Sequence, residues 1–398
     1  MPGFEVFGVE EKDEINQVLD TGVLFRYEFP NERRGIYKVR EFEESFAGYC
    51  GVRYAQAVTS GTAALKVALT AMGVGPGDEV ITQGFTFVAT WEAIFDVGAT
   101  PVFTEVDQTL NMDPVDLERK ITPRTKVIIP VHMLGAPARI EEIVKIAEAH
   151  DIPVLEDTAQ APGAGINGRK CGSFGLCGTF SFDPVKTITT GEGGMIVTDD
   201  QELWRKMSEY HDHGHDHVAN PGGRGGEGRS FIGFNFRMME LQGAIGLAQL
   251  AKLDGIVTAQ RRNKAILREL VSALPGVSFR TVLDHDGDNA SFLAFFLPDG
   301  ARARQTNELL GKNGAGAVCF ADNTWHYYPK WEHLLAGSTL AAGGWPFSDV
   351  DGRRRVYYDP AALPKSADIM ERLLVYPVPV NLSEERVAQI AGAIKTAC

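Results

Sequence analysis

The sequence predicts an α/β protein: a large domain with a mostly parallel sheet, then a smaller α+β domain at the C-terminal end. A chain of 398 residues is too long for one ordinary hydrophobic core. From residue 54 onward, short apolar runs alternate with helical stretches, as they do in sheets covered by helices on both faces. After about residue 260, helices mix with shorter strands. We therefore expect two domains, residues 1–258 and 259–398.

The elements follow from apolar periodicity. Helical spacing of apolar residues predicts two helices near the N-terminus, at 10–20 and 40–48. Ligands of parallel sheets bind beyond the carboxyl ends of the strands, so residues that follow the predicted strands are candidate site residues. The predicted strands are 55–58, 79–82, 100–106, 126–131, 152–155, 179–182 and 195–197, and helices between them include 63–72, 91–95 and 140–150.

The second half of the chain begins with an irregular segment. Residues 211–230 contain four alternating histidines and then a glycine-rich run, which predicts a mobile surface loop. A long helix at about 239–267 is expected to link the two domains. The smaller domain is predicted to contain helices at 261–274, 302–313 and 384–397 and strands at 278–281, 294–296 and 316–319.

Composition excludes several classes of protein. The net charge of −13 and the pI of about 5.2 argue against a nucleic-acid or anionic-membrane partner. No apolar run approaches the roughly 18 residues of a membrane-spanning helix. The N-terminal residues lack the basic and apolar regions of a signal peptide, so we expect a cytoplasmic protein with reduced thiols at its five scattered cysteines.

Two residues carry the main chemical signal. Asp157 ends one apolar run, and Lys186 follows another and precedes a glycine-rich loop. Pyridoxal 5′-phosphate (PLP) enzymes need this pair, because a lysine binds the cofactor aldehyde as a Schiff base and an acid keeps the pyridine nitrogen protonated. Taken alone, Lys186 could be a surface lysine, and Glu156 or Asp157 could face solvent. Since side chains alternate along a strand, only one of these two carboxylates can point into a site.

Other residues suggest how a phosphorylated ring would be held. Ser60 or Thr62 is a plausible N-cap, and Gly61 lets a backbone amide approach an anion at a helix N-terminus. Phe87 could stack on a ring, although a phenylalanine after a strand is more often core. Two further polar residues complete the set: Gln160 could bond the ring's phenolic oxygen, and Ser181 could donate to the phosphate.

Two polar or aromatic clusters have open interpretations. The run 211–217, which includes His213 and His215, is interpreted mainly as a substrate-facing loop, with a solvated loop or a metal site as alternatives; no metal is expected. The run 325–331, which begins with Trp325 and His326, is either core or a wall that binds a polyol. His213, His215, Trp325 and His326 are therefore candidate substrate residues.

With these residues considered, the chain resembles the DegT/StrS-type sugar aminotransferases, a PLP-dependent branch of the aspartate aminotransferase fold (fold type I). The resemblance covers nearly the whole length, and its motifs occur in the family's order. They lie at 60–65, 77–80, 85–87, 122–126, 156–160, 181–186, 190–194, 233–237 and 249–250.

The resemblance implies a role for each matched residue. Lys186 would be the Schiff-base lysine and Asp157 the partner of the pyridine nitrogen. Asn235 would reach the phosphate of the neighbouring subunit, which makes a homodimer the functional unit. L-glutamate would be the amino donor and a keto-sugar or sugar acid the acceptor. The remaining cofactor contacts would be Gln160 at the ring oxygen, Phe87 on the ring face, and Gly61, Thr62 and Ser181 at the phosphate.

Departures from the family pattern indicate a subgroup. Pro162, Asp183, Val185 and Thr187 differ from the usual residues beside the cofactor. Together with residues 1–5, 212–217 and 323–327, they resemble the enzymes that make 8-amino-3,8-dideoxy-octulosonate (8-amino-Kdo), a lipopolysaccharide sugar, from an 8-oxo sugar acid. The alternatives are a nucleotide-sugar aminotransferase, a PLP-dependent sugar dehydratase, which Lys186 argues against because those enzymes carry histidine there, and a non-catalytic regulator.

Overall fold

The computed structural model describes residues 2–217, 229–349, 353 and 355–398. Its centre is a sheet whose strands follow one another in the order β3-β2-β4 and β5-β8-β9-β1. Parallel bridges between Ile128 and Val154 and between Val131 and Asp157 join the two groups. Only β9 runs against its neighbours. The strands are β1 (Tyr54–Val58), β2 (Glu79–Gln83), β3 (Thr100–Thr104), β4 (Thr125–Ile128), β5 (Leu155–Asp157), β8 (Cys177–Ser181) and β9 (Gly194–Thr198).

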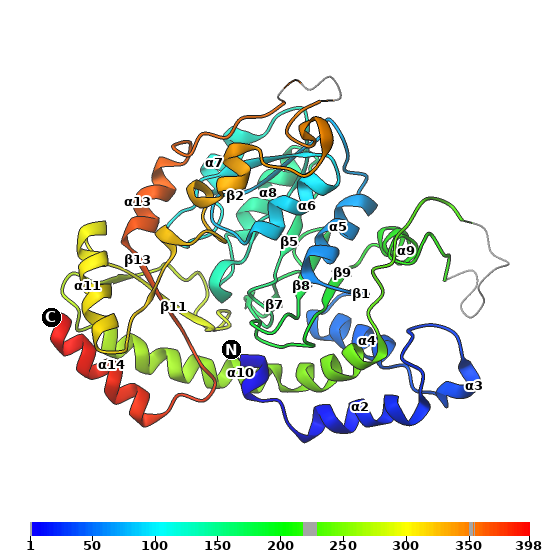
Figure 1. Cartoon of the computed structure of the whole chain (residues 1–398), viewed down its shortest axis with the longest axis horizontal. Helices are drawn as coiled ribbons and strands as arrows, with labels where there is room; N and C mark the ends of the chain where they lie inside the picture. The colour runs from blue at the N-terminus through cyan, green and yellow to red at the C-terminus, as the bar shows by residue number, and fades with distance from the viewer. Residues whose placement is uncertain (1, 218–228, 350–352, 354) are drawn as a thin grey trace.

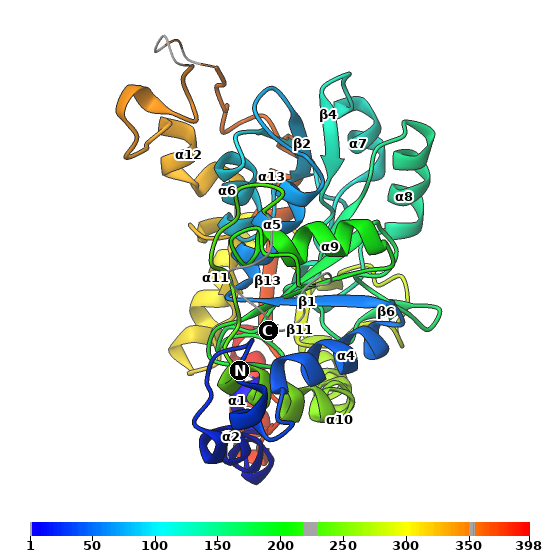
Figure 2. The same cartoon turned by 90° about the vertical axis from the view of Figure 1, so that its right-hand side faces the viewer.

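Helices cover both faces of this sheet, as the continuous apolar strands predict. Along β9, Ile196 faces one core, whereas Met195 and Val197 face the other. Figure 2 shows α5 and α9 on one side of β1 and α4 and α10 on the opposite side. The helices are α4 (Lys38–Cys50), α5 (Gly61–Ala71), α6 (Val88–Asp96), α7 (Pro114–Lys120), α8 (Ile140–Ala149), α9 (Gln201–Tyr210) and α10 (Glu240–Val271).

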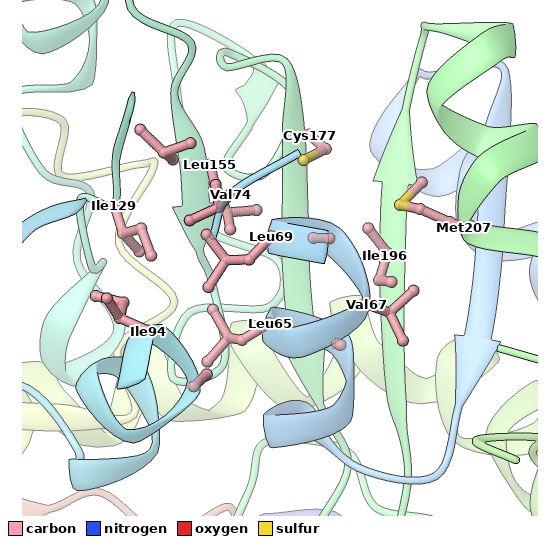
Figure 3. Packing of buried hydrophobic residues seen from close by; sticks show 14 of the residues in the cluster. Leu65, Val67, Leu69, Val74, Ile94, Ile129, Leu155, Cys177, Ile196 and Met207 are labelled. Carbon is pink, nitrogen blue, oxygen red and sulfur yellow. The ribbon is translucent and has the colours of Figure 1, made fainter. Parts of the chain in front are cut away.

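Packing under α5 fixes the start of that helix against the sheet. Leu65 and Leu69 point towards Ile94 and Ile129, and Val67 points towards Ile196 (Figure 3). All six side chains are nearly inaccessible to solvent. Burying an aliphatic side chain of this size contributes about 1.5–3 kcal/mol, so this interface holds the N-terminus of α5 firmly at the sheet's carboxyl edge.

A second, antiparallel sheet lies in the C-terminal part, on the left in Figure 1, and confirms the predicted α+β character. Its strand order is β10-β11-β13-β12. Strand β13, which pairs with both β11 and β12, is not among the predicted strands. The elements are β10 (Ser278–Phe279), β11 (Phe292–Phe296), α11 (Gly300–Lys312), β12 (Val318–Cys319), α13 (Pro364–Arg372), β13 (Leu373–Pro377) and α14 (Glu384–Ala397).

The long helix α10 differs from the sequence prediction. Two helices were expected, at 239–267 and 261–274, but one unbroken helix spans Glu240–Val271. It runs along both sheets in Figure 1 and passes through position 258. The division into domains after residue 258 therefore stays a prediction.

The remaining elements are short or lie near the N-terminus. None of the helices in the described ranges combines the length and the apolar character needed to cross a bilayer. All five cysteines are free thiols. These elements are α1 (Pro2–Glu5), α2 (Val9–Thr21), α3 (Pro30–Arg33), β6 (Gly165–Ile166), β7 (Arg169–Lys170), α12 (Glu332–Ala336) and the 3₁₀ turns Met133–Gly135, Phe320–Asp322, Tyr328–Lys330 and Ala342–Gly344.

Candidate active site

A cavity of about 400 Å³ lies at the carboxyl edge of the central sheet. Side chains reach it from the ends of β1, β2, β5 and β8, which is where ligands of such sheets bind. The structure thus brings together Ser60, Asp157 and Lys186, which the sequence analysis placed after predicted strands. The predicted residues among its lining are Gly61, Thr62, Phe87, Asp157, Gln160, Ser181 and Lys186.

The N-terminus of α5 forms one end of the cavity. Ser60 is the N-cap, and its Oγ accepts from the Ala63 amide at 3.0 Å. The first-turn amides of Gly61 and Thr62 have no acceptor within the helix and lie at the positive end of its dipole. A Cβ at Gly61 would lie 2.6 Å from the Ser181 Cβ, so only glycine permits this close approach. A hydroxyl and free amides converge here, which fits a phosphate group.

Asp157 forms a buried part of the site and is 4% exposed. Its Oδ2 accepts from the Thr90 hydroxyl at 2.8 Å, and its Oδ1 accepts from the Ala159 amide at 3.1 Å. Burial raises the pKa of the Asp157 carboxyl, and the two hydrogen bonds act against the rise. A cationic ring nitrogen beside this carboxylate would favour its ionised form further.

Glu156 points away from the cavity, as the alternation along a strand requires. Its carboxylate is fully buried and accepts from three backbone amides, those of Gly172, Phe174 and Gly175, at 2.6–2.8 Å. The His132 ring also contacts it, with Nε2 at 2.9 Å from Oε2. Since the Ala138 amide donates to Nδ1, the His132 proton lies on Nε2 and faces Glu156. The prediction that only one of the two carboxylates faces the site is confirmed.

Lys186 lies in the segment 182–193, between β8 and β9. A turn at Asp183 precedes it, because the Val185 amide donates to the Asp183 Oδ1 at 2.8 Å. The Lys186 side chain is 12% exposed, and its Nζ lies 3.6 Å from the Asp183 carboxylate. The same Nζ lies 5.8 Å from the centre of the Phe87 ring. The amine is therefore held inside the cavity mouth, between a carboxylate and an aromatic face.

Phe87 forms part of an aromatic wall. Residues 325–328 run beside residues 84–88, because the amides of Thr86 and Val88 donate to the carbonyls of His326 and Trp325 at 3.0 Å. The rings of Phe87 and Trp325 are stacked with centres 5.7 Å apart and planes 4° apart. Trp325 is 59% exposed, so this run is not core throughout. His326 is half-buried, whereas Tyr327, Tyr328 and Trp331 are buried core residues.

Gln160 lines the cavity between Asp157 and the loop after β4. Its Oε1 accepts from the Leu134 amide at 3.0 Å, so the amide NH₂ group is the part that can donate to a ligand. Leu134 adopts a left-handed conformation with φ of 54°. This is uncommon for leucine and occurs where surrounding contacts hold the backbone.

Comparison with known proteins decides the family. The sequence profile of the DegT/DnrJ/EryC1/StrS aminotransferase family matches residues 8–340. The chain belongs to this family. It is a PLP-dependent aminotransferase that acts on sugars, and it has the fold type I structure.

Curated relatives are sugar-biosynthesis enzymes of this family. The chain is 48% identical to a GDP-perosamine synthase of Caulobacter vibrioides over 223 residues, which is 56% of this chain and 58% of that protein. It is 36% identical to UDP-N-acetyl-3-dehydro-alpha-D-glucosamine 3-aminotransferase of Acidithiobacillus ferrooxidans, over 89% of this chain and 87% of that one.

Solved structures of family members superpose over almost the whole chain. 3-Amino-5-hydroxybenzoic acid synthase gives a TM-score of 0.80 at 29% identity, and covers 98% of this chain and 96% of its own. The Helicobacter pylori aminotransferase involved in pseudoaminic acid biosynthesis gives 0.81 at 26% identity, with the same shares covered.

The histidine run differs from the predicted surface loop. Residues 218–228 of the predicted loop lie outside the described residues. In the described part, His211, Asp212 and His215 are buried, which makes the surface prediction wrong for them. Tyr27 covers part of this run, since its hydroxyl contacts the His211 Nε2 at 3.0 Å and its ring stacks on His217 with ring centres 3.8 Å apart. No group of three or more metal-ligand side chains is found among the residues with described structure.

Three predicted site residues lie away from the cavity of their own chain. His213 is exposed, and His215 packs beside His217 with ring centres 4.2 Å apart. Asn235 is exposed and is bridged through its backbone to Asp212. These three are not among the described residues that line the cavity, and neither are Trp325 and His326, which contact the Phe87 ring. Their roles stay predictions.

Thr90 and Thr86 are site residues that were not predicted from the sequence. Their hydroxyls are 2.8 Å apart, and Thr90 donates to Asp157. The spacing of Thr90 from Phe87 was the one sequence feature that could have indicated it. Thr90 lies three residues after Phe87, the N-cap of α6, and residues three apart lie on the same face of a helix. Threonines are common in helices, so the spacing alone does not distinguish them.

Proposed function

We propose that the chain transfers an amino group from L-glutamate to a carbonyl on a sugar, with Lys186 and Asp157 as its catalytic residues. The main observation in its support is that a buried carboxylate, a lysine amine and a helix N-terminus line one cavity. These groups suit the ring nitrogen, the aldehyde and the phosphate of PLP, respectively.

Each residue has a distinct part in this proposal. Bound PLP supplies an electron-accepting ring that stabilises negative charge on the substrate carbon bearing nitrogen. Asp157 presents its anion to the ring nitrogen, and Phe87 covers one ring face. Lys186 would take the proton from that substrate carbon and pass it to the cofactor carbon that carried the aldehyde. The phosphate is held by Gly61, Thr62 and Ser181, and the ring oxygen by the Gln160 amide.

Replacement of Lys186 tests this proposal. Lys186→Ala should lose the visible absorption band of the lysine-bound cofactor and all conversion of glutamate to 2-oxoglutarate. Lys170→Ala is the matched control, since Lys170 lies on β7, outside the cavity lining. A Lys186→Ala protein that kept its band and its turnover would refute the assignment.

We further propose that the functional unit is a homodimer in which Asn235 reaches the partner's phosphate site. Its exposure, beside exposed Phe231, Ile232 and Phe234, suits a residue that faces another subunit. Mixing Lys186→Ala and Asn235→Ala subunits should restore about a quarter of wild-type activity, because half of the random dimers contain one intact site. If Asn235 acts within its own chain, mixing restores nothing.

For the acceptor, we propose the 8-oxo-3,8-dideoxy-octulosonate of lipopolysaccharide sugar biosynthesis. Two of the segments that indicate this subgroup contact the site: residues 323–327 run beside Phe87, and the Gly3 amide donates to the Lys186 carbonyl at 3.4 Å. The names of the curated relatives favour a nucleotide-linked ketosugar instead.

Competition between the two acceptors discriminates these possibilities. With the 8-oxo acid and a GDP-linked ketosugar in one assay, our proposal expects amination of the acid in preference to the nucleotide sugar. Preferential amination of the nucleotide sugar would establish the alternative. A deoxygenated, nitrogen-free product would instead indicate the dehydratase reaction.

A further inference from the structure

The first residues of the chain pack directly against the segment that carries Lys186. Gly3 is buried in α1. A Cβ on Gly3 would lie 2.9 Å from the backbone nitrogen of Thr189 and 3.1 Å from the carbonyl carbon of Ile188. Neither of these is a flexible side-chain end that could move aside. Glycine at position 3 therefore lets one backbone lie on the other.

Two further hydrogen bonds attach the same N-terminal residues to other parts of the chain. The Lys252 amine of α10 donates to the Val6 carbonyl at 2.9 Å. The Asn381 amide, beyond β13, donates to the Glu5 carboxylate at 2.9 Å. In Figure 1 the N-terminus lies beside α10, between the two sheets. Residues 2–7, which we call the N-terminal strap, thus connect the Lys186 segment to both halves of the molecule.

A chain of buried hydrogen bonds attaches the same segment to α10 and, through it, to α2. The Thr189 amide donates to the Gln249 Oε1 at 3.3 Å, and the Gln249 NH₂ donates to the Glu11 carboxylate at 2.7 Å. Glu11 is fully buried and also accepts from Lys252 at 2.7 Å. A buried, multiply bonded carboxylate makes a rigid attachment point.

We propose that the N-terminal strap is a positioning element that fixes the Lys186 segment and so sets the position of the amine. The segment 182–193 has no helix or strand of its own, and a small displacement of a catalytic group lowers its effectiveness strongly. The strap lies just before the part of the chain that the family profile matches, which begins at residue 8. The proposal rests on the role assigned to Lys186.

Gly3→Ala is the direct test, because one methyl group meets the backbone of the Lys186 segment. Gly48→Ala is the matched control, since a Cβ there has no atom of the described structure within 4 Å. In the holoenzyme, Gly3→Ala should weaken PLP affinity about tenfold, shift the pH midpoint of the visible cofactor band, and speed amide hydrogen exchange in residues 186–191. Gly48→Ala should change none of these.

A chain that begins at Gly8 is the second variant and removes the strap altogether. It should show the same three changes, with a larger loss of PLP affinity. Wild-type affinity, band and exchange in either variant would overturn the proposal, as would a lower Tm with those three properties unchanged. The Lys186→Ala experiment distinguishes failure of the proposed function from failure of the strap proposal. A retained cofactor band in Lys186→Ala would refute the role of Lys186, whereas an unaffected Gly3→Ala protein would refute only the positioning role of the strap.

Discussion

Thr90 donates a hydrogen bond to the Oδ2 of Asp157 at 2.8 Å, and both side chains are buried. The Thr86 hydroxyl lies 2.8 Å from Thr90 and extends this chain of polar groups. Asp157 is buried from water, so Thr90 replaces part of the hydration that an ionised carboxylate needs. The orientation and the charge of Asp157 therefore depend on a residue of α6.

Thr90→Val should weaken PLP binding about tenfold, since one hydrogen bond to a charged group is worth about 1.5–3 kcal/mol. Thr90→Ser retains the hydroxyl and should bind nearly as wild type. Fluorescence titration measures both affinities. A PLP analogue with carbon in place of the ring nitrogen provides the control, because its binding does not depend on an ionised Asp157. Equal losses for both ligands would contradict this account.

Gly61→Ala should abolish tight phosphate binding, because the new methyl group would lie 2.6 Å from the Ser181 Cβ and force the two elements apart. We expect the affinity for PLP to fall by at least about tenfold, while the weaker affinity for pyridoxal, which lacks the phosphate, changes little. Competition titration with the two vitamers measures the difference. A similar loss for both would place the damage elsewhere in the cavity.

His326 should remain neutral well below the usual range for histidine. Burial, assisted by the positive charge of Lys186, lowers the pKa of His326 to about 4. The unfolded chain takes up this proton near pH 6.5, whereas the folded chain does not until about pH 4. The contribution of His326 to the free energy of unfolding therefore falls as the pH drops between these values. NMR of labelled histidine, assigned with His326→Phe, measures the midpoint; a value near 6.5 would contradict the prediction.

Glu156→Gln should destabilise the fold by about 2–4 kcal/mol, because an amide NH₂ cannot accept from the backbone donors around it. Urea denaturation measures this cost. Asp157→Asn is the companion variant, since it alters the neighbouring carboxylate on the cavity side. It should change the stability less and the cofactor spectrum more. The reverse ranking would mean that the two acids have exchanged roles.

Local patterns were enough to predict the cavity. Ser60, Asp157 and Lys186 follow apolar strands, and parallel strands bring such positions to one edge. Alternation along β5 also separated Glu156 from Asp157 correctly. Both inferences depend on neighbouring residues and on the sheet's geometry, which the sequence contains directly.

Long-range burial could not be predicted in the same way. The four histidines at 211–217 are polar and lie beside a glycine-rich run, so the sequence favours a surface loop. In the structure, Tyr27, far away in sequence, covers His211 and His217.

Strand β13 was missed for a related reason, since its five residues show no alternation and become a strand by pairing between β11 and β12. The helix α10 has no glycine or proline break near 258–271 to separate the two helices that were expected.

The pairing of residues 325–328 with 84–88 has a practical consequence for protein engineering. The loop bearing Trp325 is hydrogen-bonded to the backbone on either side of Phe87, the residue that we assign to the face of the PLP ring. The loop and Phe87 therefore cannot be redesigned separately. Transplanting this loop from a relative to alter sugar preference would also tilt Phe87. Successful chimeras should need residues 84–88 and 325–328 exchanged together.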